Sequence, residues 1–384
     1  MRVKNKINKF IDFASHKNSL RIERNKFKDN SRKKIYSNIN LTKSQMEEIN
    51  SLYLKFYGKR VPYLWHKYYM AYNGKFDRFY FPELLYIPEF ERYMNLNKSL
   101  ADIIENKNIL PIFASFSNVR MPKTIISCQD GILKNERFEV IDKKQATMIL
   151  SSIGEVFYKP SVGTCSGVGC KLLNFINGNE INLQQSVEQF LDNADINFVI
   201  QEKIECHDSI KNIYSKSANT FRIMTYRWKN EILIVPSVMR IGQGGSFLDN
   251  AHAGGMFVAI NDDGILHKTA YTESKKVYEF HPDTQVKFEG YKIENFSLVR
   301  DAAIKMHNNL AELGVINWDF TIDSTGEPVL IEANVNGGGI WIFQMAHGKG
   351  PFGENTPEIL KWLSFMNKTK FEEREKYSFG KIKE

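Results

Sequence analysis

Two β-prone stretches near the end of the chain constrain both its fold and its chemistry. Residues 316–323 and 329–336 are mostly apolar and are joined by a short segment with Gly and Pro, which predicts a β-hairpin. Because side chains alternate between the faces of a strand, Glu332 and Asn334 should share a face that Asp319 can meet from the other strand. Carboxylates buried together are costly without a cation, and Mg²⁺ prefers such oxygens together with water and phosphate. The hairpin predicts a metal site, although a solvated polar face would explain these residues about as well.

Two glycine-rich segments favour a phosphate-containing ligand. Residues 337–339 follow the hairpin and would let the backbone approach a ligand closely, which favours the metal site. A predicted strand at 155–159 ends in Lys159, and the small-residue loop after it could bind anionic oxygens through its N–H groups. The expected loop contacts are Gly163, Ser166, Gly167 and Gly169. The lysine precedes the glycines and a strand follows them, so this is not a P-loop, and taken alone it is better explained by a flexible hairpin with a surface lysine.

A strand that turns polar could supply a pocket for adenine. Residues 199–204 are apolar at first and polar at the end, which suits a segment whose main chain pairs with a base edge. The expected pocket residues are Gln201, Glu202, Lys203 and Ile204, followed by Glu205, His207 or Asp208 for the ribose hydroxyls. For any one of the last three residues, an ordinary strand end is the stronger explanation.

Two arginines lie within apolar strands of a predicted antiparallel pair. Arg222 and Arg240 need an anionic partner there, and no carboxylate is near them in the sequence, so a phosphate or acyl phosphate is favoured over a structural salt bridge. The loop 249–255 that follows is small and polar, as expected of an active-site loop, and contains Asn250 and His252. His252 alone is as easily a loop histidine as a catalyst.

Length and composition indicate several subdomains. At 384 residues the chain exceeds one small core, and it has no apolar run of the ~20 residues that span a bilayer. The four cysteines show no CxxC spacing, which favours reduced thiols in the cytoplasm. A short buried strand is expected at 109–114. The expected parts are a basic arm (1–40), a helical, aromatic lobe (41–115), a subdomain with the glycine loop (116–203), a subdomain with the hairpin (204–367) and a frayed tail (368–384).

The positive charge is concentrated at the start of the chain. The net charge is +8, and residues 1–34 hold 12 Lys and Arg against 3 acids, so the rest of the chain is close to neutral. This distribution argues against a pure nucleic-acid binder. The arm could contact a membrane surface or another polyanion, but a solvated, partly ordered extension is the preferred interpretation.

Taken in order, these segments resemble the ATP-grasp superfamily over roughly residues 100–365. They are most similar to its sugar-transfer-associated branch, with teichuronopeptide-biosynthesis-like proteins as relatives. The motifs that carry the resemblance are Tyr158-Lys159-Pro160 with the loop to Gly169, Gln201 to Ile204, Asn219 to Arg222, Arg240, Asp249-Asn250 with Gly254-Gly255, Trp318-Asp319-Phe320 and Glu332-Ala333-Asn334.

The resemblance implies an α+β fold in which two subdomains clamp ATP beside an N-terminal helical lobe. It implies that Lys159 and the glycine loop bind the phosphates, that residues 201–204 line the adenine pocket, and that Asp319, Glu332 and Asn334 bind one or two Mg²⁺ ions. The candidate catalytic residues are Arg222, Arg240 and Asn250. ATP-grasp enzymes also use an earlier lysine, for which Lys134, Lys143 and Lys144 compete here.

The function that this resemblance implies is a carboxylate–amine ligase that works through an acyl phosphate. Its substrates would be ATP, a carboxylate and an amine, and the acceptor an amino acid, a peptide or a surface-polysaccharide precursor. A small-molecule kinase and a non-catalytic ATP-binding scaffold are the alternatives. The protein would act in the cytoplasm, with a peripheral membrane contact through the basic arm as an option.

Overall fold

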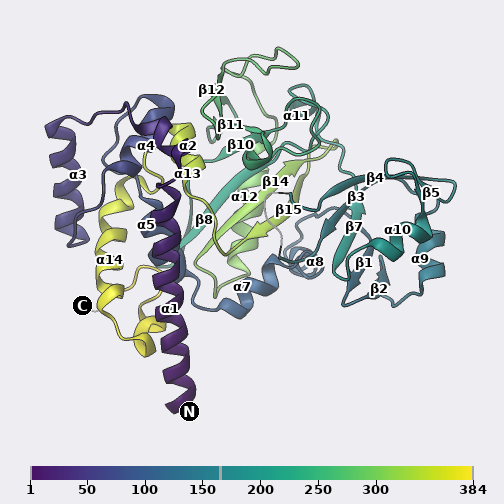
Figure 1. Cartoon of the computed structure of the whole chain (residues 1–384), viewed down its shortest axis with the longest axis horizontal. Helices are drawn as coiled ribbons and strands as arrows, with labels where there is room; N and C mark the ends of the chain where they lie inside the picture. Colours follow the sequence, from purple (N-terminus) through teal and green to yellow (C-terminus); the bar gives the residue numbers. More distant parts are fainter. Residues whose placement is uncertain (1, 164–166, 383–384) are drawn as a thin grey trace.

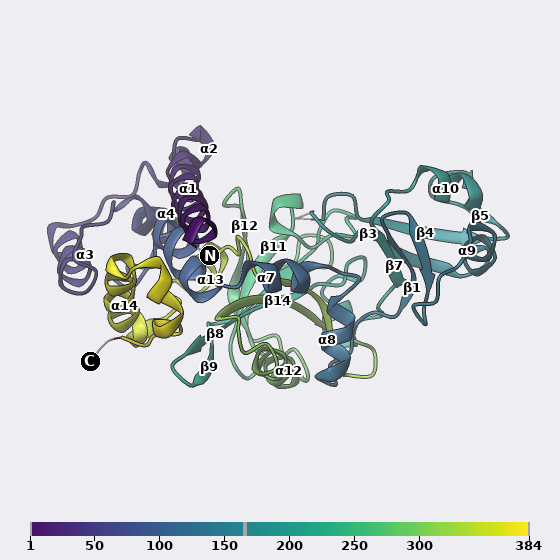
Figure 2. The same cartoon turned by 90° about the horizontal axis from the view of Figure 1, so that it is seen from below.

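The structure, a computed structural model, describes residues 2–163 and 167–382. The chain forms a helical lobe at one end, a large sheet in the middle and a small sheet domain at the other end (Figures 1 and 2). Both sheets are antiparallel throughout, and helices pack beside them, which agrees with the expected α+β class. Within the described residues, no helix is both long enough and apolar enough to cross a membrane.

The helical lobe is built from both ends of the chain. Within it, the third helix begins at a capping box: the Thr42 side chain accepts from the Gln45 N–H, and the Gln45 side chain accepts from the Thr42 N–H. The N-terminal elements are α1 (Arg2–Lys26), α2 (Asn30–Tyr36), α3 (Lys43–Phe56), α4 (Leu64–Asn73), α5 (Glu83–Leu85), a π-helical turn η1 (Tyr86–Glu91) and α6 (Arg92–Met94). The C-terminal elements are α13 (Trp341–His347), η3 (Gly353–Asn355), α14 (Thr356–Lys368) and η4 (Phe371–Tyr377).

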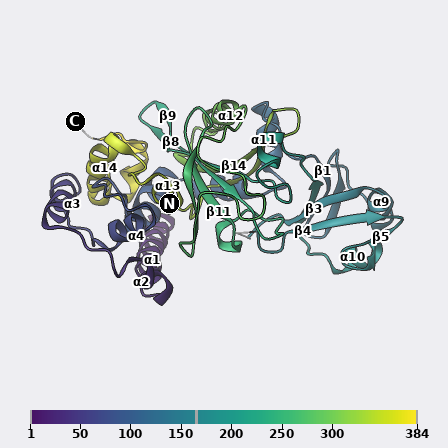
Figure 3. The ribbon, with the colours of Figure 1, turned by 90° about the horizontal axis from the view of Figure 1, so that it is seen from above.

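One aromatic core joins these two sets of helices. Figure 3 shows α3, α4, α13 and α14 grouped at the same end of the molecule. Phe90 contacts Phe352 and Trp362, with ring centroids 4.8 and 6.3 Å apart. The predicted boundary at residue 367 is therefore displaced, because α13 and α14 belong to the lobe. The tail is also more ordered than predicted: the Tyr377 ring packs 4.9 Å from Phe365.

The N-terminal arm differs from the extension that we predicted. It forms the long helix α1, in which Asp12 makes ion pairs with Arg92 and Arg374. Because these partners lie on α6 and η4, the helix is fastened to the lobe at its middle. Phe10 and Phe13 nevertheless remain 71% and 55% exposed.

The small sheet domain has the strand order β2-β1-β7-β3-β4-β5-β6. Helices α9 and α10 both begin with capping boxes and pack with the sheet in one apolar core. The elements are β1 (Thr124–Gln129), β2 (Ile132–Asn135), α9 (Lys143–Leu150), β3 (Gly154–Pro160), β4 (Lys171–Ile176), β5 (Asn179–Glu180), β6 (Gln185–Ser186), α10 (Val187–Asn193) and β7 (Phe198–Glu202).

The large sheet has the order β13-β12-β11-β10-β8-β14-β15, with β9 paired to β8. The helix α12 (Phe296–Asn308) packs on β14, β8 and β9 through apolar residues at helical spacing. The strands are β8 (Phe221–Trp228), β9 (Glu231–Ile234), β10 (Val238–Ile241), β11 (Met256–Ile260), β12 (Leu266–Thr272), β13 (Val277–Tyr278), β14 (Val315–Ile322) and β15 (Pro328–Asn334). Short helical segments α11 (Asp208–Lys211) and η2 (Ala251–Ala253) lie between them.

A connecting segment ties the two sheets together. Helices α7 (Lys98–Glu105) and α8 (Leu110–Phe116) lead into it, so the strand predicted at 109–114 is wrong. Arg120 then pairs with Glu202 of the small sheet and with Asp323 at the end of β14. Its carbonyl accepts from the Leu330 N–H at 2.8 Å. These contacts hold the small sheet against the large sheet on the side where the predicted site residues lie.

Candidate active site

A cleft between the two sheets gathers many of the predicted site residues. Lys159 enters it from β3, Arg240 from β10, Asp319 from β14 and Glu332 from β15, and Asn250 closes it from the loop before η2. The side chains on β14 and β15 meet because these strands are paired in the large sheet, and β8 pairs with β14 on the other side.

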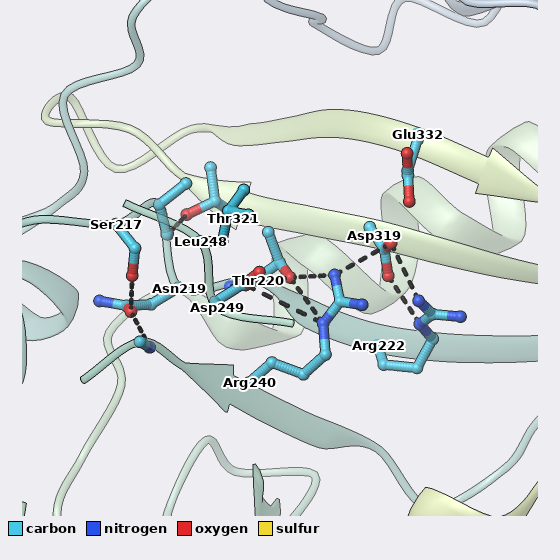
Figure 4. A network of polar contacts seen from close by, with 12 residues as sticks. Ser217, Asn219, Thr220, Arg222, Arg240, Leu248, Asp249, Asp319, Thr321 and Glu332 are labelled. Atoms are coloured by element: carbon cyan, nitrogen blue, oxygen red, sulfur yellow. Dashed lines mark hydrogen bonds and ion pairs between the residues drawn. The ribbon is translucent and has the colours of Figure 1, made fainter. Parts of the chain in front are cut away.

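Asp319 lies between the two predicted arginines (Figure 4). It is opposite Arg222 in the β8–β14 register, and its Oδ1 is 2.7 Å from Arg222 Nε. Arg240 reaches the other oxygen, with its NH2 group 3.0 Å from Asp319 Oδ2. The expectation that these arginines lack a carboxylate partner is wrong, because sheet pairing brings Asp319 to them, from 97 residues away in the case of Arg222.

Glu332 and Asn334 converge on the same carboxylate. Glu332 is the register partner of Asp319 in the β14–β15 pair. The Asn334 amide nitrogen lies 3.5 Å from Asp319 Oδ2 and 3.4 Å from Glu332 Oε1. The expected arrangement of these three side chains on one face is confirmed.

The electrostatics of this triad suit a cation. Burial raises the pKa of Asp319, the two arginines oppose the shift, and the neighbouring Glu332 adds to it. Burial would also raise the pKa of Glu332, but Lys107 and the arginines outweigh it and hold this pKa below its usual range. A bound divalent cation would favour the charged form of both carboxylates.

The residues fit Mg²⁺ better than a transition metal. Asp319 Oδ1 is buried and has no well-aligned hydrogen bond in spite of its ion pair. In the described part of the chain, no three His, Cys, Asp or Glu side chains gather as a metal cluster. Asp319 and Glu332 supply carboxylate oxygens, and the Asn334 amide would add a third oxygen after a flip, since its nitrogen faces them here. Such a set matches an ion that keeps much of its shell as water and phosphate oxygens.

Two lysines face this group, and one of them was not predicted. Lys159 is 8% exposed at the end of β3, where burial lowers its pKa and Glu332 opposes the shift. Lys107 Nζ is 3.8 Å from Glu332 Oε2, and its backbone N–H donates to the Ser161 carbonyl beside the glycine loop. Because Lys107 lies in a turn after α7, neither strand periodicity nor a glycine pattern marks it in the sequence.

The three lysines proposed from the resemblance lie elsewhere. Lys134 is on the edge strand β2, Lys143 pairs with Asp192 at 2.5 Å, and Lys144 is exposed. None of them lines the cleft. Lys107 precedes Lys159 in the chain and lies beside both Glu332 and the start of the glycine loop.

The glycine loop reaches the cleft from the small sheet domain. Gly163, Gly167 and Gly169 have φ values of +71°, +77° and +78°, which favour glycine. Gly167 lines the cleft, and a Cβ there would come within 2.9 Å of Leu248. Ser166 and its neighbours at 164 and 165 lie outside the described residues.

The predicted adenine segment is only partly directed into the cleft. Glu202, Lys203 and Ile204 line it. The buried Gln201 side chain instead donates to the Pro122 carbonyl at 3.4 Å. Asp208 is not brought to the cleft: its side chain is 77% exposed and pairs with Lys211.

Of the three residues predicted for the ribose hydroxyls, Glu205, His207 and Asp208, only Glu205 is among the described residues that line the cleft. Glu205 lines the cleft directly after the adenine segment. Phe157 and Leu172 supply apolar surface nearby. This end of the cleft thus combines apolar walls with the side chains of Glu202 and Glu205.

The loop after β10 is fixed by hydrogen bonds to Thr220, the residue before β8. Asp249 Oδ2 accepts from the N–H and the hydroxyl of Thr220, both at 2.6 Å. Asn250 lines the cleft next to it. His252 points away, and its Nδ1 is 2.6 Å from Glu273 Oε2.

The glycine run after β15 serves the protein rather than a ligand. Glu91 accepts from the Gly337 and Gly338 N–H groups at 2.7 and 2.9 Å. A Cβ on Gly338 would come within 2.1 Å of Asn317 Nδ2. Burial raises the pKa of Glu91 to about 7, against the two backbone hydrogen bonds. The inference that these glycines favour a bound ligand is wrong.

Comparisons with known proteins identify the fold. The family model described as sugar-transfer associated ATP-grasp matches residues 88–358. No curated protein matches the sequence significantly. Similar solved structures include an N5-carboxyaminoimidazole synthase from Aspergillus clavatus in complex with ADP and 5-aminoimidazole ribonucleotide (10% identity, TM-score 0.36, 62% of this chain and 46% of that one).

Two further similar structures carry ligase names. They are an L-amino acid ligase from Bacillus licheniformis (12% identity, TM-score 0.36, 67% of this chain and 48% of that one) and a D-alanine–D-alanine ligase from Bacillus anthracis (14%, 0.33, 61% and 57%). The chain thus spans about half the length of the structures that it resembles.

Proposed function

Because this chain belongs to the sugar-transfer associated ATP-grasp family, we propose that it is an ATP- and Mg²⁺-dependent ligase that joins a carboxylate to an amine. The observation that supports this best is a cleft beside a glycine loop that is lined by Lys159, Arg240, Asp319 and Glu332. Arg222 and Lys107 add two more positive charges against its two carboxylates. A binding scaffold without catalysis would not require so many buried charges in one place.

The proposed reaction has two steps. A carboxylate oxygen of the first substrate attacks the γ-phosphorus of ATP, and the bond from that phosphorus to the bridging oxygen of ADP breaks. The amine nitrogen of the second substrate then attacks the acyl carbon, phosphate leaves with its bonding electrons, and the nitrogen loses a proton. The products are an amide, ADP and phosphate.

The chain contributes charge and position rather than covalent chemistry. Lys159 and Lys107 would bind phosphate oxygens from the side of the small sheet, since both already face Glu332. Asp319, Glu332 and Asn334 would hold Mg²⁺, which would neutralise charge that develops on the phosphate oxygens.

The two arginines have different proposed roles. Arg240 lines the cleft and also contacts Thr220, so it can stabilise negative charge on the transferred phosphoryl group. Arg222 holds the opposite side of Asp319, which makes it a positioning residue for the metal site. Asn250 would orient the first substrate from the adjoining loop.

We also propose that the acceptor is a surface-polysaccharide precursor or, failing that, an amino acid or peptide. The family description is the support for this class of substrate. A cytoplasmic site of action is part of the same proposal, because the reaction consumes ATP and Cys128, Cys170 and Cys206 are free thiols.

Hydroxylamine trapping tests the proposal. With ATP, Mg²⁺ and candidate carboxylates, the acyl phosphate should react with hydroxylamine to give a hydroxamate, ADP and phosphate. Asp319→Asn should abolish hydroxamate formation, whereas Asp208→Asn should not, because Asp208 lies outside the cleft. A stable phosphorylated alcohol without hydroxamate would show a kinase, and ATP turnover without either product would contradict both.

A further inference from the structure

A second cavity lies between the helical lobe and the large sheet. Its walls come from the end of α1, from α2 and α4, from the hairpin between β12 and β13, and from the loop that contains η2. We propose that this cavity binds the phosphate group of the acceptor substrate. The proposal rests on the ligase function above for the identity of the occupant, but not for the binding of phosphate.

The cavity carries an excess of positive charge. Five Lys and Arg side chains line it against two carboxylates. The cations are Lys26, Arg32, Lys34, Lys275 and Lys276, and the carboxylates are Asp29 and Glu273. A concave surface with this charge attracts anions more strongly than a flat one, because field lines are concentrated there.

The carboxylates already have partners within the wall. Glu273 is 2.6 Å from His252 Nδ1, and Asp29 accepts from the Ser31 N–H at 2.8 Å. By contrast, Lys34, Lys275 and Lys276 have no carboxylate within 4.0 Å in the described part of the chain. These three ammonium groups are the free donors of the cavity.

Arg32 is presented rigidly at the same wall. Its NH1 group is 3.4 Å from the carboxylate of Glu83, which is buried. Its guanidinium also lies 5.5 and 5.4 Å from the ring centroids of Phe27 and Tyr68. Such a fixed guanidinium keeps further N–H groups for a phosphate, and it loses little freedom on binding one.

One short loop separates this cavity from the catalytic cleft. Asp249 and Asn250 line the cleft, and Ala251, His252 and Gly254 line the cavity. The cavity and the cleft therefore share this loop as a common wall. Lys26, Arg32 and Lys34 also account for part of the positive charge of the N-terminal arm, which helps to build a wall.

Binding of inorganic pyrophosphate tests the proposal by calorimetry. The full chain is first saturated with a non-hydrolysable ATP analogue and Mg²⁺, so that the catalytic cleft does not compete. The double variant Lys275→Gln/Lys276→Gln should bind pyrophosphate about tenfold more weakly, as expected when exposed ion pairs of moderate strength are lost. The control Lys305→Gln/Lys361→Gln removes the same charge at exposed helix positions outside the cavity and should leave the affinity unchanged.

A second arm distinguishes a soluble phosphate compound from a lipid headgroup. Vesicles of phosphatidylcholine with or without phosphatidylglycerol are sedimented with each variant. The proposal is supported if the cavity variant, but not the control, binds pyrophosphate or the vesicles more weakly. The probe that binds shows whether the phosphate belongs to a soluble compound or to a lipid headgroup. Absence of binding to both probes, or equal weakening by both double variants, would overturn it. Analogue binding by the cavity variant is measured alongside, since its retention separates this proposal from the ligase function.

Discussion

Replacement of Asp319 by alanine tests whether this carboxylate balances two buried arginines. Its side chain is 1% exposed, and those of Arg222 and Arg240 are 15% and 5% exposed. Removal of one member of a buried ion pair costs about 3–5 kcal/mol, because the remaining charge is desolvated without a partner. Arg240 keeps its contacts with Thr220 and, at 3.9 Å, with Asp249, so we expect a loss of about 3 kcal/mol in the free energy of unfolding.

The chain offers a matched control in Asp12. This carboxylate also lies between two arginines, Arg92 and Arg374, but it is 23% exposed and far from the cleft. Asp12→Ala should cost only about 1.5–3 kcal/mol, as expected for hydrogen bonds to charged groups. It should leave nucleotide binding unchanged, whereas Asp319→Ala should abolish the Mg²⁺-dependent part of that binding.

Urea unfolding and calorimetric titration with Mg²⁺ and an ATP analogue provide the two measurements. Trp318, next to Asp319, is fully buried and is one of five tryptophans whose fluorescence together reports unfolding. If Asp319→Ala folds poorly, Asp319→Asn keeps the shape and still removes the charge. Wild-type stability together with wild-type nucleotide affinity in both Asp319 variants would refute the reasoning.

Three further predictions follow from the same structure. Burial lowers the pKa of His307 to about 3, so the free energy of unfolding should fall as the pH drops below about 6.5, by about 1.4 kcal/mol per pH unit for this group. His307→Gln should reduce the slope of the unfolding free energy between pH 7 and 5, and an unchanged slope would contradict this prediction. Lys159→Met and Lys107→Met should each weaken ATP-analogue binding about tenfold or more in calorimetry, whereas Lys143→Met should not. Equal affinities in all three variants would show that neither Lys159 nor Lys107 binds the nucleotide. Gly255→Ala would place a Cβ 2.3 Å from a backbone carbonyl of the loop, so turnover should fall even if ATP-analogue affinity is retained, and wild-type turnover would show that the loop tolerates the shift.

Short-range patterns predicted the central part of the site. Strand alternation placed Glu332 and Asn334 on one face, and the turn after Ile322 brought Asp319 opposite Glu332. The capping box at Thr42 marked the start of α3 for the same reason, since both partners lie within one helical turn.

Long-range pairing was the part that the sequence could not supply. The partner of Arg222 and Arg240 depends on the order β10-β8-β14, which no local pattern encodes. Lys107 reaches the site only because its turn packs beside Ser161. The apolar run at 109–114 predicts a strand but forms the start of α8, because a short apolar segment is ambiguous between the two. Pro111 in the first turn is compatible with a helix.

The aromatic core of the helical lobe has a consequence for biosynthesis. Its first half, from α3 to α6, leaves the ribosome long before α13 and α14, which complete the same core. Until then, side chains such as Phe90 and Tyr93 lack the partners Phe352 and Trp362 that cover them in the finished protein. We expect the nascent chain to expose this apolar, aggregation-prone surface while both sheets are being synthesised, and therefore to depend on chaperones during that interval.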